Sequence, residues 1–182
     1  LATFDNSGNA VLAPTTVWTR TGTNGAQYHK IAQLSNGNIV FAASSVNAVS
    51  GFGLFYGILT IGGVIVLAPT QIDSVSAGWF PELAVCDGSF AISRSNGTDQ
   101  KAWIFSNALG VIQGGAFSSP STAGNSNNRT KLLFDGIDFY LIWHRSGDSK
   151  CVLTRLPLTG TNYSTHLIAV DASTSQYNRP VD

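Results

Sequence analysis

The stretch Leu34–Phe41 reads LSNGNIVF and places a turn dipeptide between two apolar segments. Its pattern recurs at Leu83–Phe90 as LAVCDGSF, and its turn recurs again at Phe134–Ile137 as FDGI. Asn-Gly and Asp-Gly tolerate the positive φ angles of a two-residue type I′ turn, so each copy predicts a β-hairpin. The copies follow one another at about 50 residues, which indicates an internal structural repeat.

Two further landmarks support the same spacing. The segment VLAPT occurs at Val11–Thr15 and again at Val66–Thr70. The segment QYHK at Gln27–Lys30 returns as QYNR at Gln176–Arg179, about three repeat lengths later. Independent landmarks with one common spacing make a chance origin of the repeat a poor explanation.

Each full repeat predicts four short strands. In the first they are Lys30–Leu34, Ile39–Ala43, Gly53–Thr60 and Val64–Leu67. The later repeats follow with Glu82–Val85, Phe90–Ser93, Lys101–Phe105 and Val111–Ala116, and with Lys131–Leu133, Phe139–Trp143, Cys151–Leu156 and Thr165–Val170. Four antiparallel strands per unit, without any helical periodicity, predict an all-β chain of β-propeller blades. A β-sandwich is the alternative, but sandwiches do not normally repeat internally.

The expected units are a partial blade at 1–19, blades at 27–72, 79–117 and 128–170, and the start of a further blade at 176–182. The opening segment Ala2–Val11 fits strand three, a turn at Gly8 and strand four of an incomplete unit. Two explanations fit these ends: a piece of a longer propeller, which we favour, or a ring of four closed by a composite blade.

The same residues resemble a known family of repeats. Leu34–Phe41 and Leu83–Phe90 resemble the L-x-D/N-G-x propeller repeat of large secreted bacterial proteins and phage tail proteins. The segment FDNSGNAV at Phe4–Val11 resembles the matching outer hairpin. The resemblance covers most of the chain and implies an adhesion or host-recognition role at an extracellular or virion surface. Acidic clusters typical of calcium-loaded members are missing here.

Composition excludes several classes of function. The chain has 182 residues, 43% of them hydrophobic, and its 10 basic and 10 acidic residues cancel. This balance gives no reason to expect a nucleic-acid partner. No apolar run is long enough to span a bilayer, so we expect no membrane insertion. Cys86 and Cys151 could form a disulfide or be two small buried apolar residues, and the sequence does not decide between them.

The sequence gives little support for a catalytic site or a metal site. Glu82, at the start of a first strand, and Asp138, on an otherwise apolar second strand, are the two carboxylates that could form a glycosidase pair. His29, His144 and His166 are scattered and lack metal-pair spacing. We therefore predict no catalytic residue, no metal and no cofactor.

Aromatic residues give the best candidate site. Tyr28 with His29, Trp79 with Phe80, and Tyr177 fall at equivalent positions just before the first strand of each unit. Such rings could stack on sugar faces or anchor a protein, or they could simply wedge neighbouring blades together.

With Glu82 added, these residues predict a non-enzymatic module that binds a glycan or a cell-surface receptor. The alternatives are a carbohydrate-active enzyme on the same fold and a purely structural spacer. Oligomeric assembly is compatible with all three hypotheses.

Overall fold

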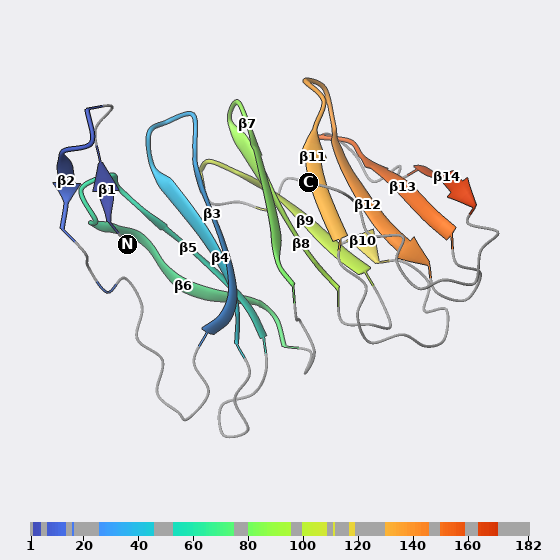
Figure 1. Cartoon of the computed structure of the whole chain (residues 1–182), viewed down its shortest axis with the longest axis horizontal. Helices are drawn as coiled ribbons and strands as arrows, with labels where there is room; N and C mark the ends of the chain where they lie inside the picture. Colours follow the sequence, from blue (N-terminus) through green and yellow to red (C-terminus); the bar gives the residue numbers. More distant parts are fainter. Residues whose placement is uncertain are drawn as a thin grey trace.

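The computed structural model of the chain describes residues 2–4, 7–13, 16, 26–45, 53–74, 80–95, 100–108, 111, 117–118, 130–145, 150–158 and 164–170. The regular secondary structure of these residues consists of β-strands alone, and all strand pairs are antiparallel (Figure 1). The all-β prediction is therefore confirmed.

Three four-stranded sheets and one hairpin make up the described chain. The hairpin consists of β1 (Thr3–Phe4) and β2 (Ala10–Leu12), and the first sheet of β3 (Ala26–Gln33), β4 (Ile39–Ser45), β5 (Gly53–Leu59) and β6 (Ile65–Asp73). The second sheet consists of β7 (Glu82–Cys86), β8 (Ser89–Ser95), β9 (Gln100–Ser106) and β10 (Phe117–Ser118). The third consists of β11 (Thr130–Phe134), β12 (Phe139–Arg145), β13 (Lys150–Leu156) and β14 (Ser164–Val170). In every sheet the strands lie in the order of the chain.

The predicted strands agree with these elements, with one difference in the second sheet. There the predicted fourth strand begins at Val111, which forms only an isolated bridge to Phe105. Residues 112–116 lie outside the described part of the chain. The opening segment forms the expected hairpin, with Gly8 in its turn at a φ of 82°.

The turns differ from the sequence prediction in length. Asp87 and Gly88 form a two-residue loop, because Cys86 pairs with Ser89. The turn between β3 and β4 has three residues, 35–37, closed by hydrogen bonds between Leu34 and both Gly37 and Asn38. Between β11 and β12 the ladder ends at the pair Phe134–Phe139, and within the four residues 135–138 the backbone N–H of Asp135 donates to the carbonyl oxygen of Asp138 at 3.2 Å. Each turn still has its glycine at a positive φ, which an L residue adopts only with strain.

The sheets stack face to face, and their first strands run side by side in one direction. The backbone N–H of Gly88 donates to Ser35 Oγ at 3.1 Å at one end of β3 and β7. Lys30 Nζ, from the middle of β3, lies 3.0 Å from Glu82 Oε1 at the start of β7. The hairpin turns therefore gather at one edge of the stack, hereafter the turn edge, at the top of Figure 1. The strand starts of β3, β7 and β11 lie at the opposite edge.

Two apolar interfaces hold the stack together. Tyr56 and Leu54 of the first sheet pack against Phe90, Trp103 and Phe105 of the second. Phe90 and Phe105 stack at 5.0 Å between ring centroids, with Tyr56 tilted against Phe105 at 4.7 Å. A second cluster joins the other two sheets and contains Ala91, Ile104, Leu141, Trp143 and Val152. The expected core positions of Tyr56, Trp103 and Trp143 are confirmed.

A buried ion pair also joins the first two sheets. Asp73 at the end of β6 accepts from Arg94 Nε of β8 at 2.6 Å, and the Arg94 side chain is only 1% exposed. Lys101 Nζ of β9 lies 3.7 Å from the same Asp73 oxygen. Charged groups removed from water in this way are costly unless they are paired, so this contact fixes how the two sheets meet.

In the third sheet the Asp-Gly dipeptide lies one residue earlier relative to the inward-facing pair than it does in the second sheet. In the second sheet Val85 pairs with Phe90, one step farther from the turn than the pair Cys86–Ser89. Val85 and Phe90 pack toward the preceding sheet. Phe134 and Phe139 do the same in the third sheet. Aligning the two Asp-Gly motifs would instead equate Phe134 with Cys86, which faces the following sheet. Four residues separate Val85 from Phe90 and likewise Phe134 from Phe139, but Asp-Gly occupies the middle two positions in the second sheet and the first two in the third. The shift of the dipeptide keeps the facing of the strands, because a slip of one residue in the strands would turn every side chain to the other face.

Candidate functional site

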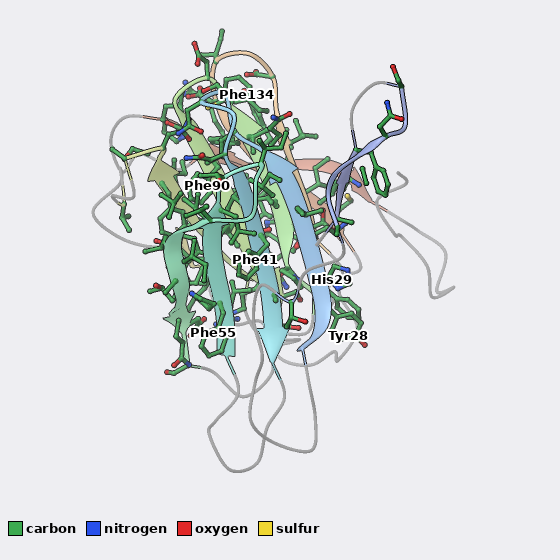
Figure 2. All side chains as sticks on the ribbon, turned by 90° about the vertical axis from the view of Figure 1, so that its left-hand side faces the viewer. Tyr28, His29, Phe41, Phe55, Phe90 and Phe134 are labelled. Carbon is green, nitrogen blue, oxygen red and sulfur yellow. The ribbon has the colours of Figure 1, made fainter. Side chains whose placement is uncertain are left out.

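Four of the predicted ligand-binding residues lie at the edge opposite the turns. Tyr28 and His29 belong to the first half of β3, Phe80 lies just before β7, and Glu82 begins β7. Figure 2 shows Tyr28 and His29 near the lower end of the first sheet. The equivalent positions of β3 and β7 thus come together because these strands run side by side.

Tyr28, Lys30, Phe80 and Glu82 form one cluster between the first two sheets, hereafter the edge cluster. The rings of Tyr28 and Phe80 lie 4.6 Å apart at an interplanar angle of 50°. Lys30 and Glu82 form the ion pair at 3.0 Å, with side chains 43% and 14% exposed. Tyr28 and Lys30 contact the second sheet together because residues two apart on a strand share a face.

His29 is not part of this cluster. It lies between Tyr28 and Lys30 on β3, so its side chain points to the opposite face of the sheet, and it is exposed. Trp79 and Tyr177 lie outside the described residues. The predicted repetition of the aromatic position in every unit is therefore seen only between Tyr28 and Phe80.

Lys30 is the member of the edge cluster that the aromatic pattern missed. A signal for it was present in the sequence, because QYHK at Gln27–Lys30 and QYNR at Gln176–Arg179 both end in a basic residue. A basic side chain at the same offset from the aromatic residue marks the position as part of the repeated pattern.

The edge cluster combines ring surface with paired charges. An aromatic face can stack on the apolar face of a sugar ring, and a carboxylate and an ammonium group can bond hydroxyl groups beside it. Lys30 neutralises Glu82 locally, and half-exposed side chains remain accessible to a ligand. The arrangement suits binding better than acid–base chemistry, because its carboxylate already has a charged partner.

The second carboxylate of the expected glycosidase pair lies far from Glu82. Asp138 belongs to the β11–β12 turn at the turn edge, whereas Glu82 begins β7 at the other edge. A strand as long as β7 separates them by more than about 10 Å, beyond the usual spacing of such pairs. These two residues do not form the pair that the sequence allowed.

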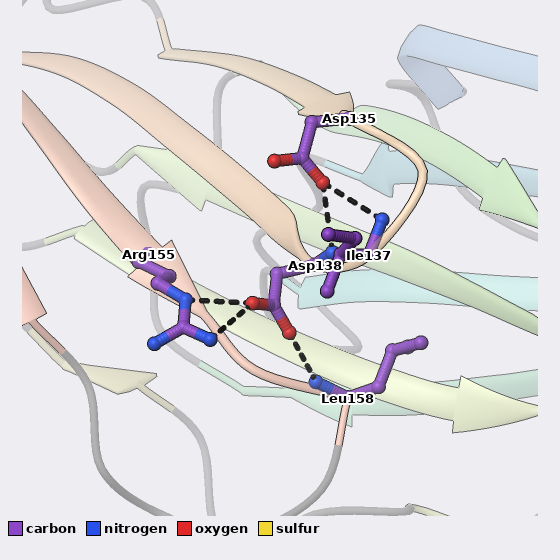
Figure 3. A network of polar contacts seen from close by, with 5 residues as sticks. All are labelled: Asp135, Ile137, Asp138, Arg155 and Leu158. Carbon is purple, nitrogen blue, oxygen red and sulfur yellow. Dashed lines mark hydrogen bonds and ion pairs between the residues drawn. The ribbon is translucent and has the colours of Figure 1, made fainter.

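Asp138 instead belongs to a structural network (Figure 3). Its Oδ2 accepts from Arg155 Nε at 2.6 Å, and its Oδ1 accepts from the backbone N–H of Leu158 at 3.2 Å. Asp135 Oδ1 accepts from the backbone N–H groups of Ile137 and Asp138 at 2.8 and 2.9 Å. Bonds from Asp138 and Ile137 lower the pKa of the Asp135 carboxyl, and the Asp138 carboxylate raises the pKa of Arg155. The network closes the four-residue turn and the end of β13.

Other expected or excluded features concern cysteine, metal and membrane chemistry. Cys86 and Cys151 are both free thiols, so the disulfide alternative is wrong for this structure. In the described ranges, no three side chains of His, Cys, Asp or Glu gather as metal ligands would. The same ranges contain no helix with the length and apolarity to cross a membrane. The side chains of His144 and His166 lie outside the described part.

Comparisons of the chain with protein-family models, with curated proteins and with solved structures found no match.

Proposed function

We propose that this chain is built of β-propeller blades and acts as a non-enzymatic binding module for a glycan or surface receptor. The propeller reading is supported by successive four-stranded sheets whose first strands lie side by side and whose faces bury apolar side chains. Radial stacking of sheets about an axis uses these contacts. An extracellular or virion-surface setting follows from the repeat resemblance.

The observation that carries the binding proposal is the edge cluster. The first sheet contributes the ring of Tyr28 and the ammonium group of Lys30, and the second contributes the ring of Phe80 and the carboxylate of Glu82. These four side chains form one partly exposed surface between the two sheets. Long side chains there make contacts across the sheet boundary and leave part of their surface free. A rigid scaffold that presents such groups at one edge suits recognition of a fixed ligand shape.

The proposal is tested with the purified chain on a glycan array and on cells that display the bound glycans. We expect binding to a restricted set of glycans and a loss of about tenfold or more for Tyr28→Ala and for Phe80→Ala. Ile137→Ala is the matched control, because Ile137 is 70% exposed at the other edge. Equal binding by Tyr28→Ala and the control would refute the site, and a blank array would refute the glycan ligand.

Charge compensation sets a second expectation for the same assay. Lys30 and Glu82 neutralise one another, so affinity should change little between low and high salt. Glu82→Gln should weaken binding without removing it. If Glu82→Gln instead keeps binding but abolishes turnover of a bound glycan, the chain is a carbohydrate-active enzyme.

A further inference from the structure

The turn between β3 and β4 contains an Asn-Gly dipeptide. The sequence has three such dipeptides, and Asn36-Gly37 is the one that lies within the described residues. Asn36 is exposed, and Gly37 is half-buried at a φ of 84°. An asparagine amide is most easily attacked by the next backbone nitrogen when glycine follows, because glycine has no Cβ to hinder the approach. The dipeptide is therefore a candidate for covalent self-modification.

The reaction needs only the chain and water. The backbone nitrogen of Gly37 attacks Cγ of Asn36, so that a new N–C bond forms and the C–N bond of the side-chain amide breaks. Ammonia leaves with the proton of the Gly37 amide, and a cyclic imide remains. Water then opens the imide at one of its two carbonyl groups. The product is an aspartate, or an isoaspartate in which the main chain runs through the side-chain carbons and is longer by one atom.

In the closed turn, hydrogen bonds hold both reacting groups. Gly37 N donates to Leu34 O at 2.9 Å, so the attacking nitrogen is bonded to that carbonyl. Asn36 Oδ1 accepts from Asn38 N at 3.0 Å, which fixes the side-chain amide. Gln33 Nε2 donates to Gly37 O at 3.4 Å and restrains the same glycine from its other side. Imide formation requires a specific approach of the nitrogen to the carbon, so these bonds must break before the reaction.

The same turn bonds the first sheet to the second. Ser35 Oγ accepts from Gly88 N and from Asn107 Nδ2, both at 3.1 Å. An isoaspartate would lengthen a turn of only three residues, and the closing bonds and the position of Ser35 depend on that length. The carboxylate of either product would also add a negative charge to a turn bonded to the one that carries the exposed Asp87. Both products therefore disfavour the closed turn and its contact with the second sheet.

From these contacts we propose that Asn36 is a self-modification site controlled by the contact between the first two sheets. While the turn is bonded to the second sheet, Asn36 keeps its amide. When the turn opens, the imide forms, and the product weakens the contact permanently. The β3–β4 turn thus acts as an irreversible switch at the turn edge. The inference is independent of the proposed glycan site, which lies at the opposite edge.

The test is peptide mapping by mass spectrometry of the full chain, incubated at mildly alkaline pH either folded or unfolded in urea. We expect Asn36 to convert about tenfold or more slowly in the folded chain than in urea. Ser35→Ala removes the hydroxyl that bonds the second sheet, so it should raise the ratio of the folded rate to the urea rate by about threefold to tenfold. Thr70→Ala is the matched control, because Thr70 is exposed on β6 and its hydroxyl donates to Ala68 O within the same strand. Its ratio should equal that of the parent chain.

Thermal unfolding of the incubated chains supplies the second readout. The converted parent should lose about 2–10 °C in its thermal midpoint. Asn36→Gln should lose less, because the longer side chain closes an imide ring far more slowly, and conversion at Asn24 or Asn96 would affect both chains alike. Three results would overturn the proposal: equal rates at Asn36 in the folded chain and in urea, equal ratios for Ser35→Ala and Thr70→Ala, and equal losses of midpoint in the incubated parent and Asn36→Gln.

Discussion

Removing Asp73 should destabilise the fold more than removing Arg94, its partner in the buried ion pair. Asp73→Ala leaves the Arg94 guanidinium in a site where its side chain is 1% exposed. Removing one partner of a buried ion pair costs about 3–5 kcal/mol. Arg94→Met leaves Asp73 with Lys101, whose ammonium is 3.7 Å away and 27% exposed. Because this second cation can compensate the carboxylate, we expect a loss of only about 1–3 kcal/mol.

The assay is urea unfolding of the parent chain and the single and double variants, followed by fluorescence and circular dichroism. A loss of about 3–5 kcal/mol corresponds to roughly 6–20 °C in the thermal midpoint for a chain of this size. The double variant Asp73→Ala with Arg94→Met should be more stable than Asp73→Ala alone, because no buried charge remains. If Arg94→Met proves the more destabilising single change, the assignment of Lys101 as the compensating cation is wrong.

Three further outcomes follow from the described contacts. Gly57→Ala should cost about 1–3 kcal/mol in unfolding measurements, because a Cβ there would lie 2.6 Å from the ring of Phe41; stability equal to the parent would show that the ring can move away. Asp135 has a lowered pKa in the folded chain, so its contribution is present above its ordinary pKa of 3.8 and is lost as pH falls through the folded value. The thermal midpoint should therefore fall less on acidification in Asp135→Ala than in the parent, and parallel pH profiles would contradict this. Burial raises the pKa of the Cys86 and Cys151 thiols, so a thiol reagent at neutral pH should label both much faster after unfolding; rapid labelling of buried Cys86 in the native chain would show that the second interface opens.

Local sequence signals predicted the strands and turns. Alternation, apolar runs and Asn-Gly or Asp-Gly dipeptides act within a few residues, so Leu34–Phe41 and Leu83–Phe90 could be assigned to hairpins directly. The repeat spacing then predicted that Tyr28 with His29 and Trp79 with Phe80 occupy equivalent positions, and Tyr28 and Phe80 are the two rings that meet. Their contact follows once β3 and β7 lie side by side, so half of the edge cluster was within reach of the sequence.

The place of the Asp-Gly dipeptide within each turn could not be predicted in the same way. Asp87-Gly88 and Asp135-Gly136 look alike in sequence, yet Asp87-Gly88 lies in the middle of residues 86–89, whereas Asp135-Gly136 forms the first half of residues 135–138. Asp138 decides the second case, because Arg155 and the backbone of Leu158 hold its carboxylate at the end of the turn. These partners lie 17 and 20 residues away along the chain, outside the range of turn propensities.

Secondary structure and the repeat could be predicted from the amino-acid sequence, because both arise from short segments of the chain. Which sheet faces meet and which charges pair depends on how the sheets pack in three dimensions. Phe134 faces inward because Asp-Gly lies one position earlier in its turn than in the turn of the second sheet, and Asp73 meets Arg94 because two sheets stack with their ends in register. Such contacts depend on the sum of several loop lengths and strand twists, and a change of one residue in any of them turns the side chains to the other face.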